Sequence, residues 1–78
     1  MPTVLRVGPY RCFFYTGDRE EPKHVHVERD DHVAKFWLNP VVMEKTGGLG
    51  RADIGRILEI VEAHQEELME AWNEHLQG

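Results

Sequence analysis

The pattern that most restricts the fold lies in the last third of the chain, where apolar residues recur at spacings of three and four. This spacing places them on one side of an α-helix, whose period is 3.6 residues. It predicts an amphipathic helical segment over about residues 51–76, with an acidic opposite side. The apolar positions are Ile54, Ile57, Leu58, Val61, Leu68, Met69, Trp72 and Leu76.

The predicted helical segment is longer than the strands beside it. At 1.5 Å per residue it spans roughly 39 Å, whereas a strand of about five to seven residues spans about 17–24 Å. His64 and Gln65 interrupt the apolar stripe midway, where a long helix must either overhang a small sheet or bend. We expect the second half, with Met69 and Trp72, to project beyond the sheet.

The first half of the chain reads as strands separated by turn signals. The predicted strands are 3–7, 10–16, 24–29 and 32–38. Residues 17–23 and 45–50 read as loops, and the apolar segment 41–43 either extends the sheet or lines its edge. The sequence therefore predicts an α+β fold, in which a small antiparallel sheet of three to four strands is packed on one face by the helical segment.

The sequence is short enough for residues 1–78 to form a single domain with a thin core. A domain of this size buries only about 60% of the surface of its unfolded chain, so a homodimer or a partner interface would add useful burial. The one cysteine, Cys12, cannot form an internal disulfide, and we expect a small buried hydrophobe. We expect a cytoplasmic protein with no membrane segment, because no apolar run approaches about 20 residues and no signal-peptide layout is present.

The charge of the chain bears on its partners. The formal net charge of −5 disfavours diffuse binding to nucleic acid, which needs basic surface to displace counterions from phosphates. Much of the acid lies in the predicted helix, whereas arginines and lysines are frequent in the first half. A neutral or mildly basic face on the sheet is therefore compatible with the composition.

The most informative segment is the run Pro22-Lys23-His24-Val25-His26-Val27-Glu28. Alternate side chains of a strand share a face, so His24 and His26 point one way while Val25 and Val27 point the other. The valines belong against the helix. We therefore expect both imidazoles to lie on the uncovered face of the sheet.

A tight turn at Asp30-Asp31 would set the pairing of this strand with the next. Counting outward from the turn places His26 opposite Lys35 and His24 opposite Trp37. The same register gathers the apolar residues of both strands on the other face, and a slip of one residue would mix the two sets. We expect this register.

These neighbours suggest a catalytic centre made of His24, His26 and Lys35. Lys35 beside His26 would disfavour protonation of the ring, which favours a neutral imidazole able to act as general base near pH 7, with His24 as the acid. Trp37 offers a flat surface on which a base can stack, and Arg11 or Arg6 can bind a phosphate. We expect no cofactor and no metal.

Three other interpretations stay open. The histidines are equally compatible with a solvated sheet face that has no chemistry. A metal site would need a third protein ligand, for which Glu28 or His32 are the candidates, and no established metal-binding motif is present. The aromatic sheet face and the overhanging helix could instead form a non-enzymatic surface that binds a protein.

Several motifs together resemble a bacterial family of small uncharacterised domains, some members of which are called DhiT toxins. The resemblance spans nearly the whole chain. The Pro-x-His-Val-His motif of that family corresponds to Pro22, His24, Val25 and His26, with Lys23 at the variable position. The other matching segments are Met1-Pro2-Thr3-Val4-Leu5-Arg6, Gly8-Pro9-Tyr10-Arg11, Phe13-Phe14-Tyr15, Ala34-Lys35-Phe36-Trp37-Leu38, Glu67-Leu68 and Ala71-Trp72-Asn73.

This resemblance implies the toxin of a type II toxin–antitoxin pair, in complex with a small antitoxin protein. It implies that His24 and His26 form the active centre, and leaves the reaction open. Together with the residues, it suggests a metal-independent, ribonuclease-like or nucleotide-directed enzyme acting on an RNA or a nucleotide. The extension of the site to Lys35 and Trp37 rests on the strand register alone.

Overall fold

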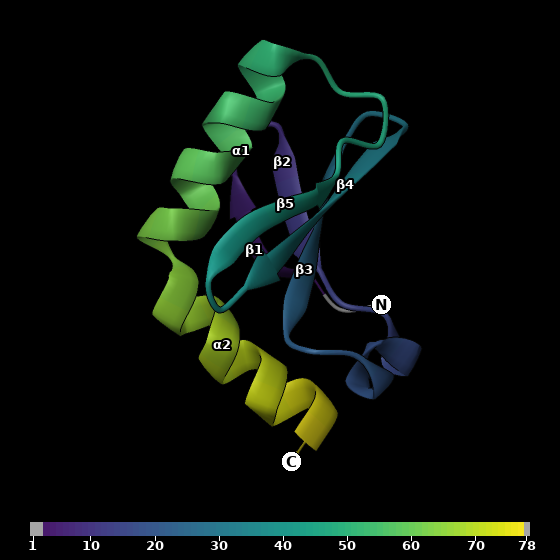
Figure 1. Ribbon diagram of the computed structural model, residues 1–78, viewed down its shortest axis with the longest axis vertical. Helices are drawn as coiled ribbons and strands as arrows, with labels where there is room; N and C mark the ends of the chain where they lie inside the picture. The colour runs from purple at the N-terminus through teal and green to yellow at the C-terminus, as the bar shows by residue number, and fades with distance from the viewer. Residues whose placement is uncertain (1–2, 78) are drawn as a thin grey trace.

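The computed structural model describes residues 3–77, which form a five-stranded antiparallel sheet followed by helices (Figure 1). The strands lie in sequence order across the sheet, so each pairs with its neighbour along the chain. The elements are β1 (Thr3–Val7), β2 (Tyr10–Phe13), the 3-10 helix η1 (Thr16–Glu20), β3 (His24–Arg29), β4 (His32–Leu38), β5 (Val41–Lys45), α1 (Arg51–Ala63), α2 (Gln65–Trp72) and the π-helical turn η2 (Asn73–Gln77). The predicted α+β class is confirmed.

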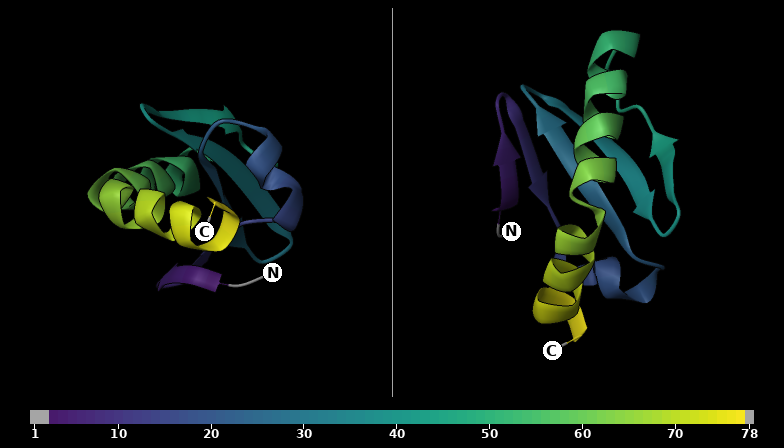
Figure 2. Two further views of the ribbon diagram at one scale, coloured as in Figure 1. Left: turned by 90° about the horizontal axis from the view of Figure 1, so that it is seen from below. Right: turned by 90° about the vertical axis from the view of Figure 1, so that its left-hand side faces the viewer.

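The two α-helices lie along one face of the sheet, and η1 lies on the opposite side (Figure 2). The core forms between the helices and the sheet, where Val25 and Val27 from β3 pack with Ile57 and Val61 from α1, all without solvent exposure. Tyr10, Arg29 and Asp53 tie α1 to the sheet, because both the Tyr10 hydroxyl and the Arg29 guanidinium donate to Oδ1 of Asp53. The prediction that the valines dock under the helix is confirmed.

The predicted register between β3 and β4 is confirmed at every pair. His26 lies opposite Lys35 and His24 lies opposite Trp37. The turn at Asp30 that fixes this register has a positive φ of 55°, a conformation that aspartate tolerates better than most residues.

The sheet has five strands, one more than the largest number expected. The additional strand, β5, contains the apolar segment 41–43 and forms the edge of the sheet beside β4. The second strand is shorter than expected, because β2 ends at Phe13 rather than at residue 16. Phe14 is instead buried in the core. Thr16, expected as the end of the strand, and residues 17–20, expected as loop, form η1.

The interruption at His64 and Gln65 is a bend between α1 and α2. The second half of the helical segment extends past the ends of the strands (Figure 1), but Trp72 is not left uncovered there. It is only 1% exposed and packs against Phe14 and His24, while Met69 packs partly buried against the core. The Gln65 side chain fixes the bend by donating to the carbonyl oxygen of Leu38 over 2.7 Å. None of the helices described is long and apolar enough to cross a membrane.

Candidate functional site

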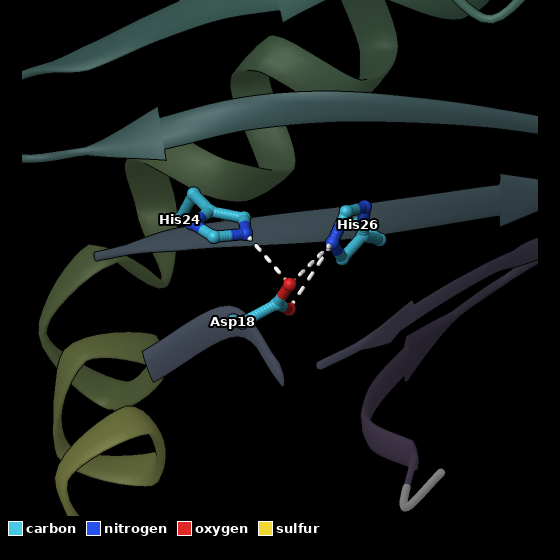
Figure 3. Close-up of side chains that lie close together, drawn as sticks. All are labelled: Asp18, His24 and His26. Carbon is cyan, nitrogen blue, oxygen red and sulfur yellow. Dashed lines mark hydrogen bonds and ion pairs between the residues drawn. The ribbon is translucent and has the colours of Figure 1, made fainter. Parts of the chain in front are cut away.

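The two histidines of β3 lie side by side on the face of the sheet that α1 leaves free (Figure 3). Their ring centroids are 5.1 Å apart and the rings are nearly perpendicular, at 87°. The prediction that both rings share this face is confirmed. The expectation that they are open to solvent is wrong for His24, which is fully buried, whereas the side chain of His26 is 12% exposed.

Asp18 from η1 covers the histidines and contacts both (Figure 3). Its Oδ1 lies 3.1 Å from Nε2 of His24, and its Oδ2 lies 3.1 Å from Nε2 of His26. Asp18 itself is only 9% exposed. We refer to these three residues as the Asp18–His24–His26 cluster.

Asp18 is held in place by the short turn that contains it. The backbone N–H of Tyr15 donates to Oδ2 of Asp18 over 2.8 Å, and the N–H of Asp18 donates to the carbonyl oxygen of Tyr15. Asp18 is the third residue of the turn, and its side chain reaches back to the N–H of the residue that precedes the turn, as the acidic residue of a capping box does. At the other end of η1, Lys35 donates to Glu21 over 2.6 Å and so ties the turn to β4.

The hydrogen bonds of His24 determine which nitrogen carries a proton. Its Nδ1 donates to the carbonyl oxygen of Pro22 over 2.8 Å, because a carbonyl can only accept. In the neutral ring, Nε2 is therefore unprotonated. This nitrogen is fully buried and has no hydrogen-bond partner among the described residues, although Oδ1 of Asp18 is near enough for an ion pair.

His26 lies in an aromatic frame. The Phe13 ring stacks on it with centroids 5.5 Å apart, and the Tyr15 ring meets it edge-on at 4.6 Å. Tyr15 is 40% exposed, so this side of the frame borders solvent. His26 is therefore the histidine of the cluster that a small molecule can reach.

Burial and charge act in opposite directions on the ionisation of the cluster. Burial is the largest single influence on the pKa of His26 and lowers it, the hydrogen bond and the charge of Asp18 raise it, and positive charge on His24 and Lys35 lowers it again, so that this pKa lies below its usual value. Burial alone would raise the pKa of Asp18. The Tyr15 N–H, the His26 hydrogen bond and the charges of both histidines together bring that pKa below its usual value. The geometry therefore favours an ionised carboxylate beside a neutral His26 ring.

The structure brings some of the expected site residues near the cluster. Lys35 is adjacent to His26 in the register, but its ammonium group turns to Glu21 and lies 4.7 Å from the centre of the Trp37 ring. Trp37 contacts His24 edge-on, with centroids 5.6 Å apart. Lys35 and Trp37 therefore lie beside the cluster, on the neighbouring strand β4.

The arginines lie on the other side of the cluster. Arg11 donates to Glu28 over 2.8 Å and to Thr3, and its guanidinium lies 4.4 Å from the centre of the Phe13 ring. Arg6 is exposed on β1, two strands away from β3. Arg11 is thus at the edge of the aromatic frame, and Arg6 is outside the site.

Glu28 and His32 are the two sequence candidates for a third metal ligand, and both side chains are engaged elsewhere. Glu28 pairs with Arg11, and His32 bonds the carbonyl oxygen of Gly47. Asp18 lies beside the two histidines instead, and the strand pattern gives no indication of it. Its only sequence signal is a Gly-Asp pair in a stretch that reads as a loop, where aspartate commonly bonds its own backbone.

The fold and the cluster define the class of protein: a small α+β domain whose sheet carries helices on one face and a carboxylate that bridges two imidazoles on the other. The chain belongs to a family described as a domain of unknown function, DUF4160, whose pattern matches residues 10–73. This match covers the whole cluster, and it confirms the expected membership of a family of uncharacterised domains. The search of curated proteins and that of solved structures gave no match.

Proposed function

We propose that this protein is the toxin of a bacterial toxin–antitoxin pair and that the Asp18–His24–His26 cluster is its active centre. The reaction is the cleavage of an RNA phosphodiester or of a nucleotide by acid–base catalysis. The observation that carries the proposal is the carboxylate of Asp18 in contact with both imidazoles, since an oriented imidazole is the commonest general base in proteins. The resemblance to DhiT toxins supplies the toxin part.

The two histidines differ in solvent exposure, and this difference assigns their roles. His26 is the general base, because it is the ring nearest to solvent. Asp18 accepts from Nε2 of His26 and leaves Nδ1, which has no partner among residues 3–77, to take a proton from the nucleophile. His24 is a positioning residue rather than the acid first assigned to it, since complete burial keeps it from touching a substrate.

Two cations flank the aromatic frame and support a substrate that carries phosphate. Arg11 borders the Phe13 ring on one side, and Lys35 lies above the Trp37 ring on the other. Positive groups in such positions stabilise the charge that develops on phosphate oxygens. In this mechanism, cleavage of the RNA or nucleotide causes the growth arrest, and the cleavage needs no metal.

The test is growth arrest on controlled expression of the chain without any neighbouring gene. We expect the wild-type chain to stop growth and His26→Gln, which keeps a polar side chain of similar size, to lose most of the effect. A residual activity of about 1% or less would match the loss of a general base. His32→Gln is the matched control, because His32 is exposed at the turn end of β4, where its ring bonds the carbonyl oxygen of Gly47.

Two results would contradict the proposal. If the wild-type chain does not slow growth, the toxin assignment is wrong. If folded His26→Gln, at equal expression, arrests growth as well as the control does, the cluster is not the active centre.

A non-enzymatic binding module is the second candidate, and a specific surface favours it. An apolar pocket of about 390 Å³ lies beside the sheet edge, lined by Pro22, Lys23, Trp37, Asn39, Pro40 and Val42. Val42 and Met43 on the edge strand β5 are exposed, at 48% and 41%. If Val42→Asp abolishes growth arrest while His26→Gln does not, this second candidate replaces the first.

A further inference from the structure

We propose that Asp18, His24 and His26 bind one divalent ion of the zinc class, through Nε2 of each ring and one carboxylate oxygen. This inference goes beyond the proposed function, which needs no metal. It rests on the positions of three ligand atoms and on the hydrogen bond that orients one of them. It does not depend on the toxin assignment.

The spacing of the ligand atoms suits a small tetrahedral ion. One ligand atom from each residue lies within 4.8 Å of the other two, and each Nε2 is 3.1 Å from a carboxylate oxygen of Asp18. Ligands about 2.0–2.1 Å from zinc in a tetrahedron are roughly 3.3 Å from one another. The three side chains therefore need only small movements to close around an ion.

The orientation of His24 is that of a metal ligand. Its Nδ1 proton is committed to the carbonyl oxygen of Pro22, which turns the lone pair of Nε2 toward Asp18. Histidines that bind metals almost always donate their other ring nitrogen to a carbonyl or a carboxylate in this way. A fully buried Nε2 without a hydrogen-bond partner is otherwise costly, and a bound cation would satisfy it.

The charge and the surroundings of the cluster favour the same occupant. Nε2 of His24 and Oδ1 of Asp18 lie 3.1 Å apart in a buried site, so a nitrogen ligand and an oxygen ligand already converge there. A divalent cation between them would attract both. The aromatic rings around the cluster, Phe13, Trp37 and Trp72, exclude water and so strengthen that attraction.

The ligand types select the kind of ion. Two imidazole nitrogens and one carboxylate oxygen suit zinc and its neighbours, whereas calcium and magnesium prefer oxygen ligands alone. Three protein ligands leave one tetrahedral position for water. With Nε2 of His26 bound to the ion, the neutral ring would carry its proton on Nδ1 and could not act as a base, so the catalytic role proposed for His26 belongs to the metal-free chain.

The experiment is titration of the purified, chelator-treated chain with Zn²⁺, followed by isothermal calorimetry. We expect one ion per chain, with a dissociation constant in the micromolar range or below. His26→Gln and Asp18→Asn should each weaken binding by about tenfold or more, whereas His64→Gln, on the helical bend, should bind as the wild type does. Co²⁺ should give the visible absorption of a tetrahedral N/O site in the wild type and lose it in His26→Gln.

His26 is partly exposed, so His26→Gln should fold, and circular dichroism verifies this before the titration. A wild-type chain that takes up no stoichiometric zinc would overturn the inference, as would folded cluster variants that bind as tightly as His64→Gln. A loss of toxicity in His26→Gln without zinc binding by the wild type would leave the proposed function standing and remove only the metal.

Discussion

The three residues of the cluster owe their properties to contacts that each makes outside it. Pro22 orients His24, Phe13 and Tyr15 enclose His26, and the backbone of Tyr15 holds Asp18. Phe13 lies opposite His26 in the β2–β3 register, whereas Pro22 and Tyr15 lie outside the strands. A change at a supporting residue should therefore alter the site as much as a change within the cluster does.

Cys12 behaves at this scale as the sequence predicts. It is fully buried in β2, and burial raises the pKa of its thiol to about 11, with a smaller contribution from the charge of Glu67. The reactive thiolate is therefore scarce below that pH, and the side chain is also shielded from reagents.

We expect Cys12 of the folded chain to react with a disulfide reagent at pH 8 at least about 100-fold more slowly than in denaturant. Absorbance of the released thiol measures both rates. Rapid stoichiometric labelling of the native protein would contradict the buried position of this residue.

Among the elements, the connection from β5 to α1 depends on a glycine. Gly47 has a positive φ of 65°, and a Cβ at this position would overlap the carbonyl oxygen of Val33 in β4. Its own carbonyl oxygen accepts from the His32 ring. The glycine-rich segment, expected as a flexible loop, is thus packed closely against the sheet.

Gly47→Ala should lower the free energy of unfolding by about 2–4 kcal/mol, because it adds both backbone strain and a steric overlap. Gly55→Ala is the control: Gly55 lies within α1 with open space around it, and alanine there should raise the free energy by roughly 0.5–1 kcal/mol. Denaturant unfolding measures both. Equal effects of the two changes would show that the close approach at Gly47 is not present.

The strands and helices whose apolar residues recur at a regular spacing could be predicted from the sequence. The alternation in β3 and β4 specified both the face of each side chain and the register, because a slip would have exposed the valines. The interruption at His64 located the bend between α1 and α2. The direction of that bend was not predictable, since it depends on how Trp72 packs against Phe14 and His24.

The fold of the whole molecule explains why two of the three cluster residues could be predicted from the sequence and the third could not. His24 and His26 lie on one strand, so their common face follows from local geometry. Asp18 reaches them only because η1 folds back over the free face of the sheet, a tertiary contact that no local pattern encodes. The same contact explains why the histidines are buried instead of solvated.

The substitution Asp18→Asn tests the central claim most directly, since it keeps the size of the side chain and removes the charge that bridges both rings. An amide oxygen can still accept from the Tyr15 N–H, so the variant should fold. In the growth assay, we expect it to be inactive while Asp31→Asn, at an exposed turn position, arrests growth as the wild type does. Full growth arrest by folded Asp18→Asn would mean that the contact between this carboxylate and the two imidazoles has no part in the activity.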